Sequence, residues 1–253
     1  MKKIEQLTQE AIEFLRDNEP EGGYAEAFSG GKDSCVIDSL IEKSGCKYTK
    51  HFARTSIDPP ELLDFIKEYH KNTIWHRPKY TMYQLIVRKK MLPSRIIRYC
   101  CEALKHYWNE VGEYVVTGIR KEESKKRQER LKVEKFGKAI MINPILDWTE
   151  KDVWEYIDEN KIPYCILYDE GFQRIGCVGC PLVSYKKMYK EFQRYPKIRY
   201  AYLKTIEKIK DNGNFDDFDN AEDIMQWWML GISKAKYLGM KEQLEIDFKE
   251  EQK

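Results

Sequence analysis

The sequence has few of the features that mark an exported or membrane-embedded protein. No uninterrupted apolar run approaches the roughly 20 residues that a helix needs to span a bilayer. The first 13 residues are charged and lack the apolar centre of a signal peptide. We therefore expect a cytoplasmic protein without a membrane partner.

The sequence also lacks a large excess of charge of either sign. Its 44 Lys and Arg residues nearly balance 42 Asp and Glu residues, which leaves a formal net charge of +2. Such a chain has no global field that would draw it to nucleic acid or to a membrane surface. Any site for an anion therefore has to be local.

The seven cysteines make a poor disulfide framework, because their number is odd and Cys100 and Cys101 are adjacent. In a chain without an export signal, such cysteines point to a reducing compartment and to metal binding or catalysis.

The pattern of apolar residues predicts an α/β fold. Strand-like and helical segments alternate as far as about residue 160, which favours a parallel sheet covered by helices. We expect a Rossmann-like, doubly wound, mostly parallel sheet of five strands, over 24–29, 48–53, 72–76, 113–119 and 138–146. Beyond Pro181 only helical patterns remain. We therefore predict an α/β domain over 1–183 and a helical C-terminal extension over 184–253.

The segment Ser29-Gly30-Gly31-Lys32-Asp33-Ser34 lies between the first expected strand and its helix. In a doubly wound sheet this junction faces the ligand crevice. Glycines let the backbone approach a phosphate closely, amides at a helix N-terminus hold an anion, and the lysine adds positive charge. The spacing matches neither the Walker nor the dinucleotide fingerprint, so it predicts a phosphate site of another type.

The string SGGKDS resembles the pyrophosphate loop of the N-type ATP pyrophosphatases, which cleave ATP between its α and β phosphates and activate a substrate as an adenylate. The resemblance implies binding of ATP with magnesium. It implies that Lys32 neutralises the charge that develops in the displacement. It further implies a phosphate cradle made by Ser29, Gly30, Gly31, Asp33 and Ser34.

Four of the seven cysteines form a spaced set, in which Cys100 and Cys101 precede Cys177-x-x-Cys180 by about 76 residues. Adjacent side chains diverge in a strand and lie about 100° apart on a helix, so both can bind only a large acceptor. An iron–sulfur cluster with separate iron corners fits that demand better than one tetrahedral zinc. Zinc and unrelated redox thiols stay open as alternatives. Amides at Gly176 and Gly179 are expected to face the cluster sulfurs.

Longer strings make the resemblance more specific. In order, RYCCEALK, TGIRKEESKKR, INPILDWTEKDVWEYI and LYDEGFQRIGCVGCPL resemble motifs of the phosphoadenosine phosphosulfate (PAPS) reductase family over about residues 20 to 185. Cluster-bearing members, the adenylylsulfate reductases, bind a [4Fe-4S] cluster through a Cys-Cys pair and a CxxC. The resemblance implies that Lys105 lies near cluster and substrate. It implies that the cluster ligands are Cys100, Cys101, Cys177 and Cys180.

The same family has a G-x-R-x-x-E-S-x-x-R element at the phosphate or sulfate end of its nucleotide. Its counterparts here are Gly118, Arg120, Glu123, Ser124 and Arg127. The element follows an expected strand, and guanidinium groups suit phosphate oxygens. The lysines beyond it, within the basic segment 120–138, are interpreted as a solvated loop.

Two features depart from the reductases. Those enzymes use a nucleophilic cysteine in a C-terminal motif, whereas the last cysteine here is Cys180, and they tend to lose parts of the phosphate loop that this chain keeps. We therefore expect an ATP pyrophosphatase-type adenylating enzyme with Lys32, Asp33 and Lys105 as catalytic residues. It would serve sulfur transfer to a tRNA base, a DNA backbone or a small molecule.

Two other interpretations stay open. One is a PAPS or adenylylsulfate reductase whose thiol is Cys165 or comes from a partner. The other is a non-enzymatic subunit that senses nucleotide and redox state and binds a partner or nucleic acid through segment 120–138. The expected partners are a sulfur donor or thiol reductant protein, or a second copy of the chain.

Overall fold

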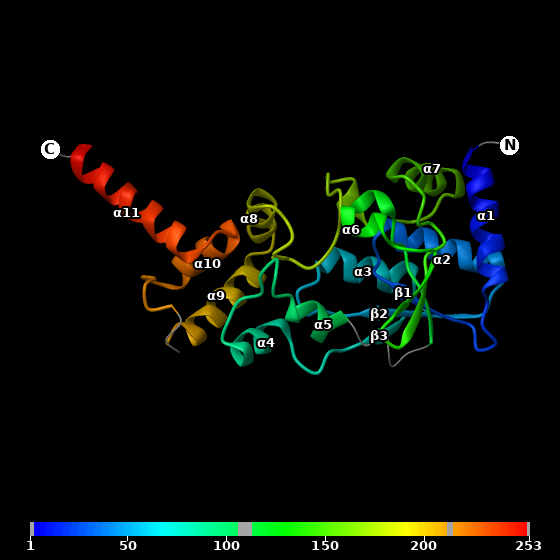
Figure 1. Cartoon of the computed structure of the whole chain (residues 1–253), viewed down its shortest axis with the longest axis horizontal. Coiled ribbons are helices and arrows are strands. Elements are labelled where there is room, and N and C mark those ends of the chain that lie inside the picture. Colours follow the sequence, from blue (N-terminus) through cyan, green and yellow to red (C-terminus); the bar gives the residue numbers. More distant parts are fainter. Residues whose placement is uncertain (1–2, 106–112, 212–214, 252–253) are drawn as a thin grey trace. The chain divides into compact units, whose positions relative to one another are not determined.

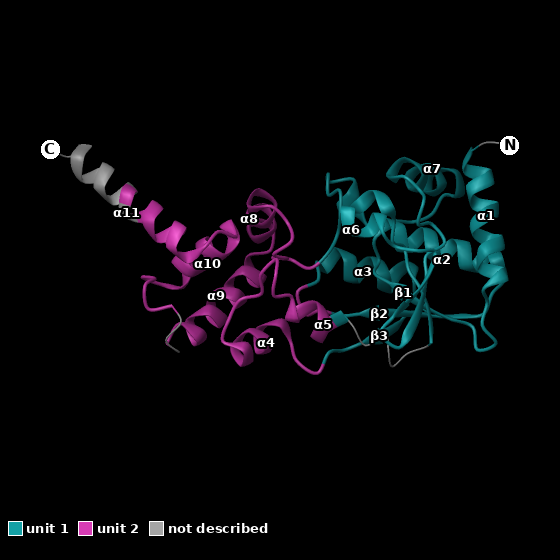
Figure 2. Cartoon of the chain, viewed as in Figure 1, with its two compact units in different colours: residues 1–54, 58–78, 105–176 teal, residues 55–57, 79–104, 177–253 magenta. Residues whose placement is uncertain are grey.

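The computed structural model describes residues 3–105, 113–211 and 215–251. The chain forms two compact units (Figure 2). The first comprises residues 1–54, 58–78 and 105–176, and the second comprises residues 55–57, 79–104 and 177–253. These bounds differ from a division at residue 183, because 79–104 fold with the C-terminal helices. The α/β domain over 1–183 stays a prediction.

The first unit is built on a six-stranded sheet. Its strands are β1 (Tyr24–Phe28), β2 (Tyr48–Ala53), β3 (Ile74–His76), β4 (Tyr114–Val116), β5 (Val133–Phe136) and β6 (Ala139–Ile142). Their order across the sheet is β3-β2-β1-β4-β6-β5, and all neighbours are parallel except β5 and β6. The order reverses beside β1, as in a Rossmann-like fold. The predicted fold class is therefore confirmed.

The strand β5 is absent from the five expected strands. It lies beyond Arg127 in the basic segment 120–138, where we expected the lysines to belong to a solvated loop, and it pairs antiparallel with β6 at the edge of the sheet. Glu134 and Lys135 interrupt the apolar alternation there, because an edge strand needs little apolar surface and is often charged. With β5 included, the sheet has six strands, one more than the five that we expected.

Five helices accompany the sheet: α1 (Lys3–Asp17), α2 (Lys32–Ser44), α3 (Pro60–Tyr69), α6 (Lys125–Gln128) and α7 (Glu150–Asn160). Short 3-10 turns occupy residues 121–123 and 166–168. The helices α1, α2 and α7 lie side by side (Figure 1). They share one buried cluster with Tyr24 of β1. The helix α3 packs in a second cluster with Phe28 and Phe52. The first unit thus positions the N-terminus of α2 at the end of the central strand β1.

Local signals place the ends of these helices. The Thr149 hydroxyl accepts a hydrogen bond from the Asp152 amide, and the Asp152 carboxylate accepts one from the Thr149 amide. The two bonds make a capping box. Gly45 ends α2 with φ of 75°, and Pro60 begins α3.

The second unit is helical. Its elements are α4 (Met82–Lys89), most of α5 (Tyr99–Lys105), α8 (Tyr185–Arg194), α9 (Pro196–Lys210), α10 (Ala221–Leu230) and α11 (Lys234–Glu251). Its core is aromatic and includes Phe192, Tyr202 and Trp228. No helix within the described ranges is both long and apolar enough to cross a membrane.

Candidate functional site

The segment Ser29–Ser34 turns from the carboxyl end of β1 into α2. Gly30 has φ of +72°, and a Cβ there would stand 2.7 Å from Leu62 Cδ1 and 2.9 Å from Ile66 Cδ1. Only glycine suits both this conformation and this space. Gly31, the N-cap of α2, places no side chain over the helix end. The loop therefore exposes backbone at a helix N-terminus, which favours an anion.

Hydroxyl groups surround this turn. Ser34 Oγ donates to Gly31 O at 2.8 Å and lies 3.2 Å from Ser29 Oγ. The Lys32 amide donates to the Tyr168 hydroxyl at 2.9 Å. Tyr168 thus accepts from the first turn of α2 and brings its own O–H group to the same place.

Lys32 directs its ammonium group toward acidic and carbonyl oxygens. Its side chain is only 5% exposed. Its Nζ lies 3.5 Å from Asp33 Oδ2, 3.3 Å from Glu150 Oε1 and 3.4 Å from Gln173 O. Such partners compensate a buried ammonium for its lost hydration. Because Glu150 is half exposed, an entering anion can take its place at Lys32.

Arg120 connects the loop with the segment that follows β4. Its side chain is 4% exposed, and its Nε donates to Asp33 Oδ1 at 2.6 Å while Nη1 donates to Glu122 Oε2 at 2.9 Å. Gly118 permits this approach, since a Cβ there would lie 3.0 Å from the Asp33 carbonyl. The orientation of the Asp33 carboxylate is therefore set by a buried guanidinium group.

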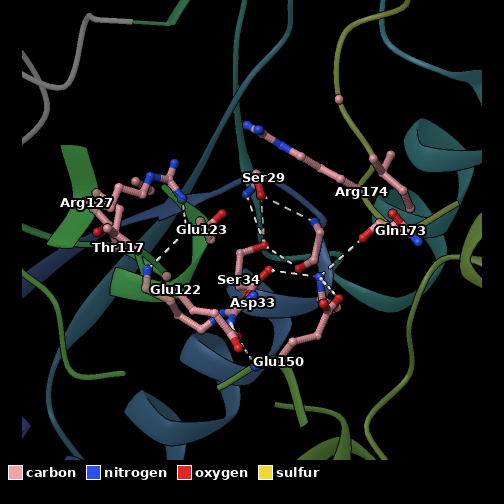
Figure 3. Close-up of a pocket in the computed structure, with 18 of the residues that line it drawn as sticks. Ser29, Asp33, Ser34, Thr117, Glu122, Glu123, Arg127, Glu150, Gln173 and Arg174 are labelled. Atoms are coloured by element: carbon pink, nitrogen blue, oxygen red, sulfur yellow. Dashed lines mark hydrogen bonds and ion pairs between the residues drawn. The ribbon is translucent and has the colours of Figure 1, made fainter. Parts of the chain in front are cut away.

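Arg127 lies near a second guanidinium group. Burial lowers the pKa of Arg127 to about 10, and the charge of Arg174 contributes to the change. Arg127 forms an ion pair with Glu123. Figure 3 shows Arg127 and Arg174 reaching toward the loop from opposite sides. An anion bound between these cations would relieve their repulsion.

These side chains enclose a cavity of about 630 Å³ at the carboxyl ends of β1 and β4 (Figure 3). Most of the predicted site residues line it: Ser29, Gly31, Lys32, Asp33, Ser34, Lys105, Gly118, Arg120, Glu123 and Arg127. Gly30 and Ser124 do not. Gly30 shapes the turn from behind, and Ser124 is an exposed residue at the start of α6.

Several polar residues of the lining were not predicted: Thr117, Glu122, Glu150, Tyr168, Gln173 and Arg174. Glu150 is the first residue of α7, where an acidic side chain is ordinary. Tyr168, Gln173 and Arg174 lie within the string LYDEGFQRIGC. That string contributed to the family resemblance, but it does not show which of its side chains point into a cavity.

The four predicted cluster ligands all belong to the second unit. Cys100 and Cys101 lie in the first turn of α5, and Cys177 and Cys180 precede α8. The pKa of Cys100 is raised by its hydrogen bond with Cys101, by burial, and by the charges of Cys101, Cys177 and Cys180. The other three thiols therefore lie close enough to act electrostatically on Cys100.

The described thiols do not form a site for a single metal ion. Among the described residues, no three His, Cys, Asp or Glu side chains are disposed to hold a single metal ion. Cys177 Sγ donates to Thr55 Oγ1 at 3.5 Å. The Gly179 amide, expected to face cluster sulfurs, donates instead to Glu191 at 3.1 Å, so that expectation is wrong. The buried Glu191 carboxylate takes this amide because it needs a donor.

The strand order and a glycine loop that opens at the carboxyl ends of parallel strands define a doubly wound α/β protein. The chain belongs to the phosphoadenosine phosphosulfate reductase domain family, whose model matches residues 23–183. The family membership predicted from the motifs is confirmed.

Three known proteins show the extent of the likeness. The chain is 30% identical over 237 residues to an uncharacterized protein of Methanocaldococcus jannaschii; the match covers 87% of this chain but only 54%, about half, of that protein. The phosphoadenylyl-sulfate reductase of Candida auris, in its phosphate complex, matches with a TM-score of 0.51 and 23% identity over 70% of this chain and 96% of that one. The FMN adenylyltransferase of Candida glabrata, in complex with FAD and inorganic pyrophosphate, matches with a TM-score of 0.52 and 16% identity over 70% and 63% of the two chains. The two structural matches establish a shared fold.

Proposed function

We propose that the first unit binds ATP in this cavity and cleaves it between the α and β phosphates, so that an acceptor becomes adenylated and pyrophosphate is released. The observation that carries the proposal is the complete glycine loop with the buried Lys32 ammonium beside it. Holding a nucleotide needs only the amides and hydroxyls. Breaking a P–O bond also needs a cation where charge develops on the leaving group.

The residues of the cavity have different roles in this reaction. The acceptor attacks the α phosphorus, the bond to the bridging oxygen breaks, and its electron pair leaves with pyrophosphate. Ser29, Ser34 and the start of α2 bind the pyrophosphate. The Lys32 ammonium group then pairs with pyrophosphate oxygens instead of with Glu150. The Asp33 carboxylate, oriented by Arg120, offers an oxygen ligand to the Mg²⁺ that ATP brings.

The remaining cations act on the other parts of the nucleotide. Arg127 and Arg174 bind phosphate oxygens between them, which suits planar guanidinium groups. Lys105, the last residue of α5, lines the same cavity and balances charge on the α phosphate.

We also propose that the four cysteines of the second unit hold a [4Fe-4S] cluster. The support is the set of four thiols in the second unit, in which Cys101, Cys177 and Cys180 act electrostatically on Cys100. A cluster suits such a set because each thiolate binds a separate iron corner. When bound, the cluster supplies a place for sulfur or electrons. A sulfur donor protein is the expected partner, and the adenylated acceptor is a tRNA base, a DNA backbone or a small molecule.

The second candidate is a reductase of adenylylsulfate or PAPS. Family membership and the fold shared with the Candida auris reductase favour it. Cys165 is a poor source of the required thiol, because it is fully buried in the core of the first unit with Phe28 and Leu167. The thiol of a reductase would therefore come from a partner protein.

Three assays on anaerobically purified protein separate the candidates. Pyrophosphate release from ATP and Mg²⁺, raised by one of the three acceptor classes, supports the adenylating enzyme. Sulfite release from adenylylsulfate or PAPS with a thiol donor supports the reductase. Tight nucleotide binding without either product supports a sensing subunit and overturns both enzymes.

Replacement of the loop lysine tests the catalytic role directly. We expect Lys32→Gln to lower kcat for pyrophosphate release by about 10²- to 10³-fold, because it removes the cation that stabilises the leaving group. The matched control is Lys121→Gln, since Lys121 pairs with Asp147 on the surface and is 43% exposed. A Lys32→Gln protein with an unchanged kcat would exclude this role.

A further inference from the structure

The second unit carries a large local excess of positive charge. Its segments 79–104 and 177–210 contain 15 Lys and Arg residues but only three acidic residues. One of these acids, Glu191, is buried, and another, Glu207, pairs with Lys204 at 2.9 Å. Because the whole chain has a net charge of only +2, this excess is offset elsewhere in the sequence. These two segments therefore produce a local field that attracts a polyanion.

Much of this charge lies on three helices that pack together. Helix α9 packs against both α4 and α8, and α4 and α9 lie side by side (Figure 1). At the end of α4, the side chains of Arg88, Lys89 and Lys90 are exposed, and none of them forms an ion pair with another described residue. Such unpaired cations are available to the phosphate groups of a ligand.

A cavity of about 350 Å³ opens between α4 and α9. Its lining includes the side chains of Tyr80, Tyr83, Arg88 and Lys208. Arg88 lies over the Tyr80 ring, with its guanidinium carbon 4.4 Å from the ring centroid. The ring of Tyr83 meets the buried ring of Tyr202 edge to face, with centroids 5.6 Å apart, and is thereby fixed to the core. The cavity thus combines aromatic side chains with two cations, and its volume suits a small planar group.

This combination of side chains matches the parts of a nucleotide. A base stacks on a tyrosine ring, and an arginine or lysine beside the ring pairs with the phosphate. Gln84 lines the same cavity, and its Oε1 accepts a hydrogen bond from the Thr81 amide at 2.9 Å. The NH2 group of Gln84 has no partner within the described ranges, so it is available to donate to the edge of a base.

Tyrosine rings beside cations also occur outside the cavity. Tyr200 of α9 is 61% exposed, and Lys204 Nζ lies 5.7 Å from its ring centroid. Tyr189 of α8 is 48% exposed and lies next to Tyr185, with ring centroids 6.1 Å apart. A mononucleotide needs one such place, whereas the successive bases of a strand need several. The arrangement therefore favours a polynucleotide whose bases are unpaired.

We propose that the second unit binds a single-stranded nucleic acid, with one base in the cavity beside Tyr80 and Tyr83 and the phosphates on the basic residues of α4, α8 and α9. A duplex keeps its bases stacked inside, and an anionic membrane offers charge without a planar group. The basic segment 120–138 belongs to the first unit, so this surface is a different one. Among the three proposed acceptor classes the surface favours a nucleic acid. That choice rests on the proposed function, whereas the binding itself does not.

The test measures the fluorescence anisotropy of labelled oligonucleotides of about 20 residues, which are longer than the usual site size of a single-strand binder. The full chain is titrated into single-stranded RNA, single-stranded DNA and a duplex of the same sequence. We expect a single strand to bind more tightly than the duplex. Its binding constant should fall as the salt concentration rises, because phosphate contacts release counterions. A preference between the two single strands identifies RNA or DNA as the source of the ligand.

Two variants locate the site. Tyr80→Leu should weaken single-strand binding by about 5- to 100-fold, because a stacked base loses its ring. Arg88→Gln should also weaken binding and lower the slope of its salt dependence by about 0.7, because one phosphate contact is lost. The matched controls are Tyr69→Leu and Lys67→Gln on α3 of the first unit, whose side chains are exposed, and neither should change the affinity. Melting temperatures establish that each variant is folded.

A wild-type chain that binds none of the three oligonucleotides overturns the inference and leaves the proposed ATP chemistry standing. Binding to vesicles of anionic phospholipid without binding to oligonucleotides overturns it as well, since the partner is then a membrane. Equal affinity of folded Tyr80→Leu and wild-type protein, or of duplex and single strand, overturns the placement of a base in the cavity. Tight single-strand binding that does not raise pyrophosphate release supports the inference and removes nucleic acid from the proposed acceptors.

Discussion

Glu26 and Asp38 are neighbouring acidic residues of the first unit, and their pKa values are shifted in opposite directions. Glu26, on β1, is fully buried, and neither of its oxygens has a hydrogen-bond partner in the described part of the chain. Burial raises its pKa well above the usual range, and the charge of Asp38 adds to this. Burial alone would raise the pKa of Asp38 too, but hydrogen bonds with His70 and Lys50 outweigh it and lower that pKa. The surroundings thus favour the ionised form of Asp38, a residue of α2, and the neutral acid of Glu26.

This difference predicts a pH-dependent gain from Glu26→Gln. Because the pKa of Glu26 is higher in the folded than in the unfolded protein, stability falls as pH rises above the unfolded value of about 4.3. Glutamine cannot ionise, so the variant should gain about 1–3 kcal/mol in free energy of unfolding at pH 8 and much less at pH 4. Urea denaturation at both pH values measures this.

The control for that experiment is Glu13→Gln, because Glu13 is exposed on α1. Its stability should change little with pH relative to wild type. If Glu26→Gln shifts stability equally at pH 4 and pH 8, the carboxyl is not protonated in the native state.

At the scale of elements, the glycine loop is held in place by the packing of α2 and α3. The loop bends into α2 at Gly30, and α3 closes against that bend with Leu62 and Ile66. The same first turn of α2 receives Gly118 from the segment after β4. The shape of the cavity therefore depends on packing behind the loop as well as on the residues that line it.

Replacement of Gly30 by alanine should damage stability and nucleotide binding together. The left-handed conformation and the contacts at 2.7 and 2.9 Å both oppose a Cβ, so we expect Gly30→Ala to cost about 2–4 kcal/mol in free energy of unfolding. Urea denaturation and ATP titration measure the two effects. Gly22→Ala, where a Cβ would meet nothing within 4 Å, is the control and should change neither. A Gly30→Ala protein as stable as wild type would contradict this account of the turn.

At the scale of the whole molecule, the two units carry different chemistry. The first unit holds the cavity at the glycine loop, and the second unit holds the four cysteines of the predicted cluster site. The cysteines outside that set, Cys35, Cys46 and Cys165, are buried in the first unit.

This division predicts which cysteines determine metal content. Cys177→Ala should lose most of the iron and acid-labile sulfide per chain, because a cluster corner loses its thiolate. Cys46→Ala should keep the wild-type content, since Cys46 lies in the apolar cluster of α1, α2 and α7. Iron and sulfide analysis of both variants after anaerobic purification provides the measurement. Equal contents in Cys177→Ala and wild type would remove Cys177 from the ligand set.

Local patterns in the sequence were enough to predict the α/β class, the position of the glycine loop and the family, and local signals also place helix ends such as Gly45 and Thr149. Each of these depends on residues a few positions apart, whose conformational preferences do not depend on the rest of the fold. The edge strand β5 escaped prediction because its partner β6, and not its own composition, makes it a strand.

Only the tertiary structure decided which side chains meet. Glu150 and Tyr168 reach Lys32 from more than 100 residues away, and Tyr202 and Cys100 join one buried cluster in the same way. Such contacts arise from the packing of whole elements, and a local pattern contains no information about the distance between elements. The same packing left the buried hydroxyls of Thr73 and Tyr202 without a hydrogen-bond partner in the described part of the chain, and this can be recognised only when the neighbours of each group are known.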